Sequence, residues 1–409
     1  MSGIYRVTSE GYLEYSPEFF QQCMREYLGE PGLTVTAARF LGEVGVTETT
    51  RMKYRGERDR LLGLFHYAVD YTVGGRPLSG AVLAKSKTHY RDLVARLAGV
   101  LVEGGIVVPD VEELLGKTEL FNTHMKEINV FRMQKTVPAF ARVLPAVYGT
   151  YVDDRAQQYV VLEEFLANAY VIKDYSDITF WTDPRIELTM RDFARMHAAH
   201  YGNYDALVGE GWLGETMNAG RMQALTPLWR AYAEKLRHFV GKLFDQRYLD
   251  EHVRWIDTIP EWWRLIDGMR KTLIFNDAQI RNLAVRNPDG DAKLALYDWE
   301  CASIQLPQRD VVEILSYVIN ERTGCTEIAG FLDAARMQLA ADSGQQVEPQ
   351  EWLVGCRYAL RDFHVNRMAC QLSLHVTLKR PDIERVFRAS MRILACVEKQ
   401  LAEMQALPD

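Results

Sequence analysis

The chain has 409 residues, of which 48% are hydrophobic and 25% charged, and its formal net charge is −7. These values are ordinary for a globular protein that is long enough to form two lobes. The negative charge argues against a nucleic-acid-binding protein, whose surface would be basic. No apolar stretch approaches the roughly 20 residues that span a bilayer. No signal peptide is visible either, so we expect a cytoplasmic protein without a membrane partner.

The cysteines bear on the redox environment. None forms a C-x-x-C motif, and the histidines do not complete a zinc pattern. We therefore expect buried or half-buried free thiols in a reducing compartment. The six positions are Cys23, Cys301, Cys325, Cys356, Cys370 and Cys396.

The first part of the chain predicts a helix and then a five-stranded antiparallel sheet. Ser16, Pro17 and Glu18 form a helix start, and Gly29 can end that helix. Period-two alternation predicts strands near 34–42, 66–73, 78–87, 141–152 and 157–165, with helices near 89–104 and 118–134. The polar interval 46–63 is rich in basic residues between 51 and 60. It is either a solvated loop or a mobile lid.

The second part of the chain is mainly helical from about residue 186. The exceptions are strand signals at 272–275, 282–285 and 293–298. The sequence therefore predicts an α+β, two-lobed fold with a small β-rich lobe over residues 1–166 and a large helical lobe over residues 167–409. A crevice between two lobes is a common place for a ligand.

Three polar residues, Asp277, Asn282 and Asp298, follow one another around these late strand signals. Phosphoryl transfer from ATP needs one carboxylate to orient the attacking hydroxyl, and an amide and a second carboxylate to hold Mg²⁺. The spacing D-x-x-x-x-N is that of the protein-kinase catalytic loop. The alternatives are an Asx turn for Asp277 and a helix cap for Asp298. The joint order favours a kinase-like site.

The chain as a whole resembles the aminoglycoside phosphotransferase and choline-kinase-like superfamily, and most closely its ecdysteroid-kinase-like branch. The resemblance lies in motifs that follow one another in the family's order. These are an AK pair on a strand, an acid in the helix HMKEINVF, the strand end VLEEF, the helix FARMHA, the D-x-x-x-x-N loop, the strand end YDWE and a P-x-x-D turn.

The resemblance implies a role for each matching residue. Lys85 would steady the α- and β-phosphates of ATP, and Glu127 would pair with that lysine. Asp277 would be the catalytic aspartate, and Asn282 and Asp298 would hold Mg²⁺. Two sets would bind the rest of the nucleotide: backbone groups of Glu163, Glu164, Phe165 and Leu166 at adenine, and a loop with Gly42 and Gly45 at the phosphates.

Three features leave alternatives open. Phe275 stands where the family usually has a histidine two residues before the catalytic aspartate. The glycine loop is not a clean G-x-G-x-x-G, which makes it a weak signal. Glu113 and Glu119 lie near enough to Glu127 for the helix register to differ.

The function that the resemblance implies is an ATP- and Mg²⁺-dependent kinase. It would transfer the γ-phosphate to a hydroxyl group of a small molecule, namely an aminoglycoside, an amino alcohol or a steroid-like alcohol. The first alternative is a nucleotide-binding pseudokinase or scaffold without phosphotransfer, which Phe275 motivates. The second is a kinase fold that acts on protein or transfers a nucleotidyl group. The oligomeric state is left open.

Overall fold

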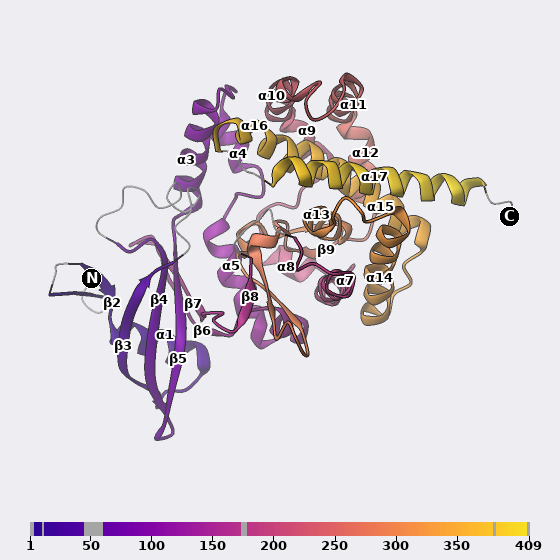
Figure 1. Ribbon diagram of the computed structural model, residues 1–409. Helices are drawn as coiled ribbons and strands as arrows, with labels where there is room; N and C mark the ends of the chain where they lie inside the picture. Colours follow the sequence, from indigo (N-terminus) through magenta and orange to yellow (C-terminus); the bar gives the residue numbers. More distant parts are fainter. Residues whose placement is uncertain (1–3, 10–11, 45–59, 173–177, 379–381, 407–409) are drawn as a thin grey trace.

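The computed structural model describes residues 4–9, 12–44, 60–172, 178–378 and 382–406. Figure 1 shows a small antiparallel sheet at the lower left and a larger body of helices beside it. The main sheet has five strands in the order β3-β4-β5-β7-β6. The predicted α+β class is therefore confirmed, whereas the boundary between residues 166 and 167 stays a prediction.

All five predicted strands of the main sheet are present, and each pairs antiparallel to its neighbour. A short hairpin of β1 (Tyr5–Val7) and β2 (Leu13–Tyr15) precedes them. The strands of the main sheet are β3 (Thr34–Glu43), β4 (Gly63–Val73), β5 (Arg76–Lys87), β6 (Val147–Asp153) and β7 (Gln158–Glu164).

Helix α1 (Pro17–Leu28) covers one face of this sheet, and it begins and ends as predicted. The Ser16 hydroxyl accepts the backbone N–H of Phe19 at 3.0 Å, and Gly29 ends the helix with a left-handed φ of 69°. The helix lies close to β6 because Gly149 has no side chain. A Cβ at that position would lie 2.8 Å from the Cβ of Cys23.

The opposite face of the sheet carries Lys85 and Glu163 and faces the helical body. Between β5 and β6 the chain forms α3 (Tyr90–Glu103), α4 (Val111–Gly116), α5 (Thr123–Arg132), the 3₁₀ turn η1 (Met133–Lys135) and α6 (Pro138–Val143). The helix expected over 118–134 is thus shorter and follows a separate α4. Ile128, Val130 and Phe131 of α5 belong to the large hydrophobic core that the C-terminal helices build.

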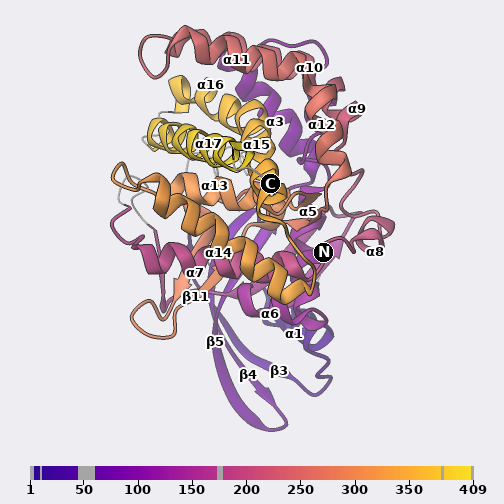
Figure 2. The ribbon, with the colours of Figure 1, turned by 90° about the vertical axis from the view of Figure 1, so that its right-hand side faces the viewer.

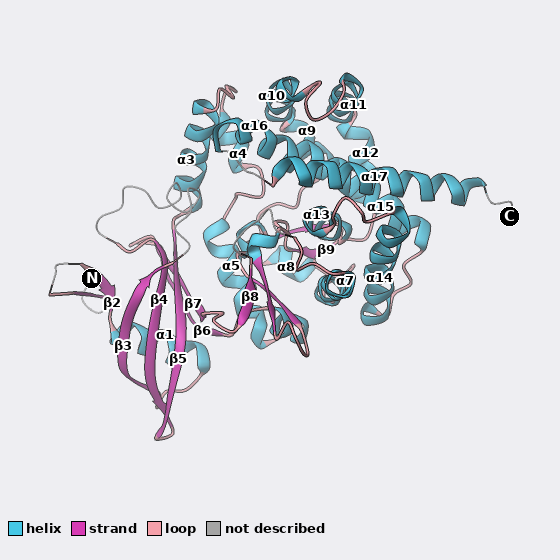
Figure 3. Ribbon diagram, viewed as in Figure 1, coloured by secondary structure: helices cyan, strands magenta, loops and turns pink. Residues whose placement is uncertain are grey.

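The helical body contains most of the remaining chain, as Figure 3 shows. Its first half consists of α7 (Asp183–Ala198), α8 (Asp205–Gly209), α9 (Ala219–Ala224), α10 (Thr226–Leu236), η2 (Arg237–Phe239), α11 (Gln246–Asp257) and α12 (Ile259–Gly268). Its second half consists of α13 (Gln308–Val318), α14 (Cys325–Ser343), α15 (Pro349–Asp362), the π-helix η5 (Phe363–Met368), α16 (Ala369–Leu378) and α17 (Ile383–Ala406).

Two small sheets lie between the main sheet and these helices. One has the order β11-β10-β8, and the other pairs β12 with β9. The sequence analysis found strand signals at β9, β10 and β11 but not at β8 and β12. Their members are β8 (Ala169–Val171), β9 (Thr272–Ile274), β10 (Leu283–Arg286), β11 (Lys293–Leu296) and β12 (Ser303–Gln305).

The last helices form the side of the body that lies away from the sheet. In Figure 2 the sheet extends below the helices, and α14, α15 and α17 lie together, in agreement with their mutual contacts. Within the described ranges, no helix combines the length and the apolar character needed to cross a membrane.

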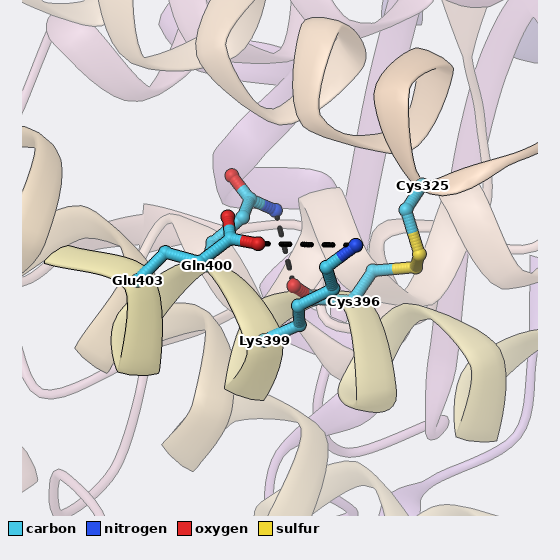
Figure 4. The surroundings of a disulfide bond; sticks show 5 residues. All are labelled: Cys325, Cys396, Lys399, Gln400 and Glu403. Atoms are coloured by element: carbon cyan, nitrogen blue, oxygen red, sulfur yellow. Dashed lines mark hydrogen bonds and ion pairs between the residues drawn. A yellow bond between two sulfur atoms is a disulfide. The ribbon is translucent and has the colours of Figure 1, made fainter. Parts of the chain in front are cut away.

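A disulfide in this region corrects the prediction for two of the cysteines. Cys325 at the start of α14 is bonded to Cys396 in α17, with their Cα atoms 5.4 Å apart (Figure 4). The two positions are 71 residues apart in the sequence, so only the packing of α14 against α17 brings them together. Cys23, Cys301, Cys356 and Cys370 are free, as predicted.

Candidate active site

Asp277 lies on a short loop between β9 and the 3₁₀ turn η3 (Ile280–Asn282), and Asp310 of α13 holds this loop in place. The Asp310 carboxylate accepts the backbone N–H groups of Phe275 and Asn276, each at 2.7 Å. It also contacts Nε2 of His197 at 2.9 Å. Asp310 is fully buried, and its two oxygens therefore fix the backbone directly before Asp277.

Three side chains hold the Asp277 carboxylate. Asn282 donates its Nδ2 to Oδ2 at 2.7 Å, and Gln279 donates its Nε2 to Oδ1 at 2.8 Å. The Nη1 of Arg367 lies 3.6 Å from Oδ1, and its Nη2 donates to the carbonyl of Asn276 at 2.7 Å. The D-x-x-x-x-N spacing thus brings Asp277 and Asn282 into contact. The sequence analysis did not find Arg367.

Lys85 of β5 lies between two carboxylates. Its Nζ is 2.9 Å from Oε1 of Glu127 on α5 and 2.7 Å from Oδ1 of Asp298. Burial alone disfavours the charge of this lysine, but Asp298 and Glu127 outweigh that effect and raise the pKa of Lys85. The partner of Lys85 on the helix is thus Glu127, and Glu119 instead pairs with Arg367 at 3.2 Å.

A second lysine, which the sequence analysis missed, lies beside the first. Lys87 is two residues further along β5, and its ammonium contacts Oε2 of Glu127 and, at 2.9 Å, Oε1 of Glu300. Both lysines are buried. Alternate residues of a strand point to the same face, so the spacing of the two lysines was a usable signal.

Asp298 and Asn282 offer the oxygen donors that a Mg²⁺ ion requires. Asn282 donates through Nδ2, so its Oδ1 faces away from Asp277, and its backbone carbonyl accepts the N–H of Tyr297 at 3.0 Å. Asp298 follows with a left-handed φ of 70°. Carboxylate oxygens of Glu127, Asp298 and Glu300 lie within 4.8 Å of one another. Lys85 and Lys87 already pair with these carboxylates, and the assignment of Asn282 and Asp298 as ligands of Mg²⁺ stays a prediction.

The segment predicted to bind adenine has most of its backbone groups engaged. The N–H of Glu164 donates to the carbonyl of Ala146 at 2.8 Å, and the N–H of Phe165 donates to the carbonyl of Ala81 at 3.0 Å. Neither N–H group is therefore available to donate a hydrogen bond to an adenine ring. Within the described part of the chain, the backbone of Leu166 has no such partner.

Aromatic and acidic side chains also mark this end of the sheet. The ring of Phe165 stacks on His66 of β4, with centroids 3.7 Å apart. Glu163 is buried on the same face of the sheet as Lys85. Its cross-strand partner is Leu83, and Leu83 and Lys85 are alternate residues of β5, so their side chains point to the same face. Burial, with a contribution from Glu127, raises the pKa of Glu163 to about 8. The side chain of Glu163 is thus a feature of the cleft, beyond the backbone role expected from the sequence.

Only part of the predicted glycine loop lies among the residues that the structure describes. Gly42 lies in β3 beside a register shift, with a φ of 143° that favours glycine. Gly45 and the basic residues from 51 to 59 lie outside the described residues. Arg60 follows them and donates to the carbonyl of Gln157 at 2.6 Å.

Comparisons with known proteins give likeness only at the level of structure. No family model matches the chain, and no curated protein matches its sequence. The structure is similar to a choline kinase from Cryptosporidium parvum Iowa II, with a TM-score of 0.46 and 12% identity over 93% of this chain and 92% of that chain. For a GDP complex of aminoglycoside 2'-phosphotransferase-IIIa, the TM-score is 0.44 and the identity 11%, over 95% and 99% of the two chains.

A third solved structure is the choline kinase LicA from Streptococcus pneumoniae, with a TM-score of 0.43 and 10% identity over 92% of this chain and 98% of that chain. The neighbours are thus small-molecule kinases of the aminoglycoside phosphotransferase and choline-kinase type. The chain itself has an α+β fold, with a five-stranded antiparallel sheet beside a large helical body. The narrower resemblance to the ecdysteroid-kinase-like branch stays a prediction.

Proposed function

We propose that the protein is a kinase that transfers the γ-phosphate of ATP to a hydroxyl group of a small molecule, with Mg²⁺ as cofactor. One observation carries the proposal. Lys85 and Glu127 from the sheet and its helix meet Asp298 in a single ion-paired cluster, and the backbone beside Asp298 contacts Asn282, which holds Asp277. These groups are the ones that phosphoryl transfer uses.

Each residue has a role in this proposal. Asp277 orients the acceptor hydroxyl and accepts its proton late in the transfer, and Asn282 and Gln279 fix the direction of its carboxylate. Lys85 binds the phosphates through its ammonium, which Glu127 positions from behind. Asn282 and Asp298 would hold Mg²⁺, which cancels phosphate charge when bound. Positioning and charge cancellation supply most of the rate in such reactions.

A nucleotide-binding scaffold without phosphotransfer is the second candidate. Arg367 favours it, because its guanidinium lies 3.6 Å from Oδ1 of Asp277, beside the carboxylate that would have to face the acceptor hydroxyl. Such a protein would bind ATP without consuming it.

An ADP-release assay with a panel of hydroxylated compounds separates the two. The kinase proposal expects acceptor-dependent turnover that falls by roughly 1,000-fold or more in Asp277→Asn, the range in which a general base contributes. The matched control is Asp289→Asn, because this exposed aspartate lies away from the cluster, at 3.8 Å from Arg185. Turnover that Asp277→Asn leaves unchanged would rule the assignment out, and binding of ATP without any turnover would favour the scaffold.

A further inference from the structure

A small cavity lies directly beside the candidate catalytic loop. Its volume is about 50 Å³, and Asn276, the residue before Asp277, is part of its lining. Glu119 also lines it, and Arg367 connects Glu119 to Asp277 through contacts of 3.2 and 3.6 Å. The cavity therefore lies beside the loop that carries Asp277, and Arg367 lies between Glu119 of the lining and the Asp277 carboxylate. A volume of this size suits a compact group, not a ring system.

Lys126 of α5 lines this cavity with a buried charge. The side chain belongs to a residue that is 1% exposed, and its Nζ donates to the backbone carbonyl of Glu119 at 2.9 Å. Within the described residues, no carboxylate oxygen lies within ion-pair distance of this ammonium. Burial lowers the pKa of Lys126 to about 8. An ammonium in such a place needs an anion to offset its lost hydration.

The carboxylates in the lining form ion pairs with arginines, and among the described residues none lies within ion-pair distance of Lys126. Glu119 shares Arg367 with Asp277, Asp362 shares Arg309 with Glu313, and Glu215 pairs with Arg221. A further ion pair at the cavity joins Lys117 to Glu113 at 2.5 Å. Lys126 is thus the lining cation that has no carboxylate within ion-pair distance among the described residues.

Two further buried groups at the cavity have open hydrogen-bonding capacity. The indole N–H of Trp263 has no acceptor in the described structure, although the residue is fully buried. The Oδ1 of Asp362 likewise has no donor, while its Oδ2 accepts from Arg309 at 3.0 Å. Buried polar groups without partners are rare. A ligand that offers an anionic oxygen to Lys126 and Trp263, and a hydroxyl to Asp362, would satisfy all three.

From these observations we propose that the phosphate acceptor is a small hydroxylated acid, whose anionic group binds in this cavity at Lys126 and Trp263. The inference rests on the kinase function proposed above, and it names the substrate class of the same site. It differs from the aminoglycoside, amino alcohol and steroid-like classes that the sequence resemblance implied, since an ammonium or a large apolar group would find no complement at Lys126.

Matched sets of acceptors with one carbon skeleton and different charge test the inference. One set is glycerate, glycerol and 3-amino-1,2-propanediol, and a second is gluconate, sorbitol and glucamine. We expect the wild-type enzyme to have at least tenfold higher kcat/KM for the acid of a set than for its neutral or cationic partners. Mass spectrometry of the product confirms the added phosphate.

Lys126→Met is the diagnostic variant, because methionine keeps the length of the side chain and removes the charge. It should raise KM for the acid at least tenfold and KM for the neutral partner far less, and it should retain or increase Tm because a buried charge without a carboxylate partner is gone. Lys126→Arg should restore part of the preference for the acid. A preference for neutral or cationic acceptors, or a preference for acids that Lys126→Met does not alter, would overturn the inference while the kinase function stands.

Calorimetric titration of glycerate and gluconate into the full-length protein decides the case in which no compound is phosphorylated. Binding of either acid that Lys126→Met abolishes would support the anion site and leave the kinase function in doubt. If neither acid binds to the wild-type protein, the anion site is wrong.

Discussion

The Oδ2 atom of Asp310 accepts the backbone N–H of Phe275 at 2.7 Å, so a residue outside the loop fixes the geometry of the catalytic segment. The ring of Phe275 is fully buried and lies edge-on to Trp299, with centroids 4.7 Å apart. Phe275, where the resemblance predicts a histidine, thus serves packing in this chain.

Phe275→His should therefore reduce stability and leave kcat at or below the wild-type value. The buried ring nitrogens would lack partners, at a cost of about 1–3 kcal/mol in the free energy of unfolding. Urea unfolding and steady-state turnover of the same preparation measure the two effects. An increase in kcat would contradict the packing role. Asp310→Asn is the complementary variant, and it should lower kcat without a large rise in KM for ATP.

The two lysines of β5 should differ in what their loss affects. Lys85→Met removes the ammonium that we propose binds the phosphates, and we expect kcat/KM for ATP to fall by roughly 100-fold or more. Lys87→Met leaves Glu127 and Glu300 with one fewer partner each, so the free energy of unfolding should fall by about 3–5 kcal/mol. Comparison of nucleotide kinetics with denaturant unfolding for both variants tests this division. Equal effects on kcat/KM would show that Lys85 has no special role at the phosphates.

Glu163 should make the stability depend on pH. Burial raises its pKa from 4.5 to about 8 in the folded protein, so the folded state holds the proton more tightly than the unfolded state. The sign follows from this: the contribution of Glu163 to stability is fully present below about pH 4.5 and is lost as the pH rises through about 8.

Glu163→Gln should accordingly be more stable than the wild-type protein at pH 9, and the difference should shrink towards pH 5. Glu164→Gln is the matched control, because this neighbour forms a two-bond ion pair with Arg286 at 2.7 and 2.9 Å and has no such burial. Thermal unfolding between pH 5 and 9 measures both. A difference between Glu163→Gln and the wild type that does not vary with pH would be inconsistent with a raised pKa.

The disulfide between Cys325 and Cys396 should stabilise the helical body by about 2–4 kcal/mol under oxidising conditions, because it restricts the unfolded chain. Thiol titration of the denatured, unreduced protein should find the four other cysteines free. Cys325→Ser should lower Tm, whereas Cys370→Ser at a free, half-buried cysteine should change it little. Six reactive thiols in the unreduced protein would show that the bond does not form.

How far the sequence could predict this molecule depends on the kind of interaction. Local chemistry was sufficient for α1, since Ser16 and Gly29 act at its two ends as expected. The D-x-x-x-x-N spacing was sufficient for the Asp277–Asn282 contact, and the family resemblance was sufficient for the pairing of Lys85 with Glu127. The first contact joins two residues that are five positions apart in the sequence, and the second joins a long strand to a helix.

The rest depends on packing that has no local signature. Arg367 lies in η5, a stretch of π-helix inside what reads as one continuous helix, and the extra residue per turn changes the direction in which its side chain points. The sequence periodicity could not show this change. The partner of Cys325 and the closeness of Lys126 and Trp263 at one cavity likewise arise from contacts between distant segments.

We propose that Asp298, Asn282 and Lys85 form one site for a metal–nucleotide complex. Titration of Mn²⁺ in the presence of ATP, followed by the electron paramagnetic resonance of the free ion, tests it most directly. We expect one tight site in the wild-type protein, and at least tenfold weaker binding in Asp298→Asn with the fold retained by circular dichroism. Equal Mn²⁺·ATP affinity in the two proteins would contradict the account.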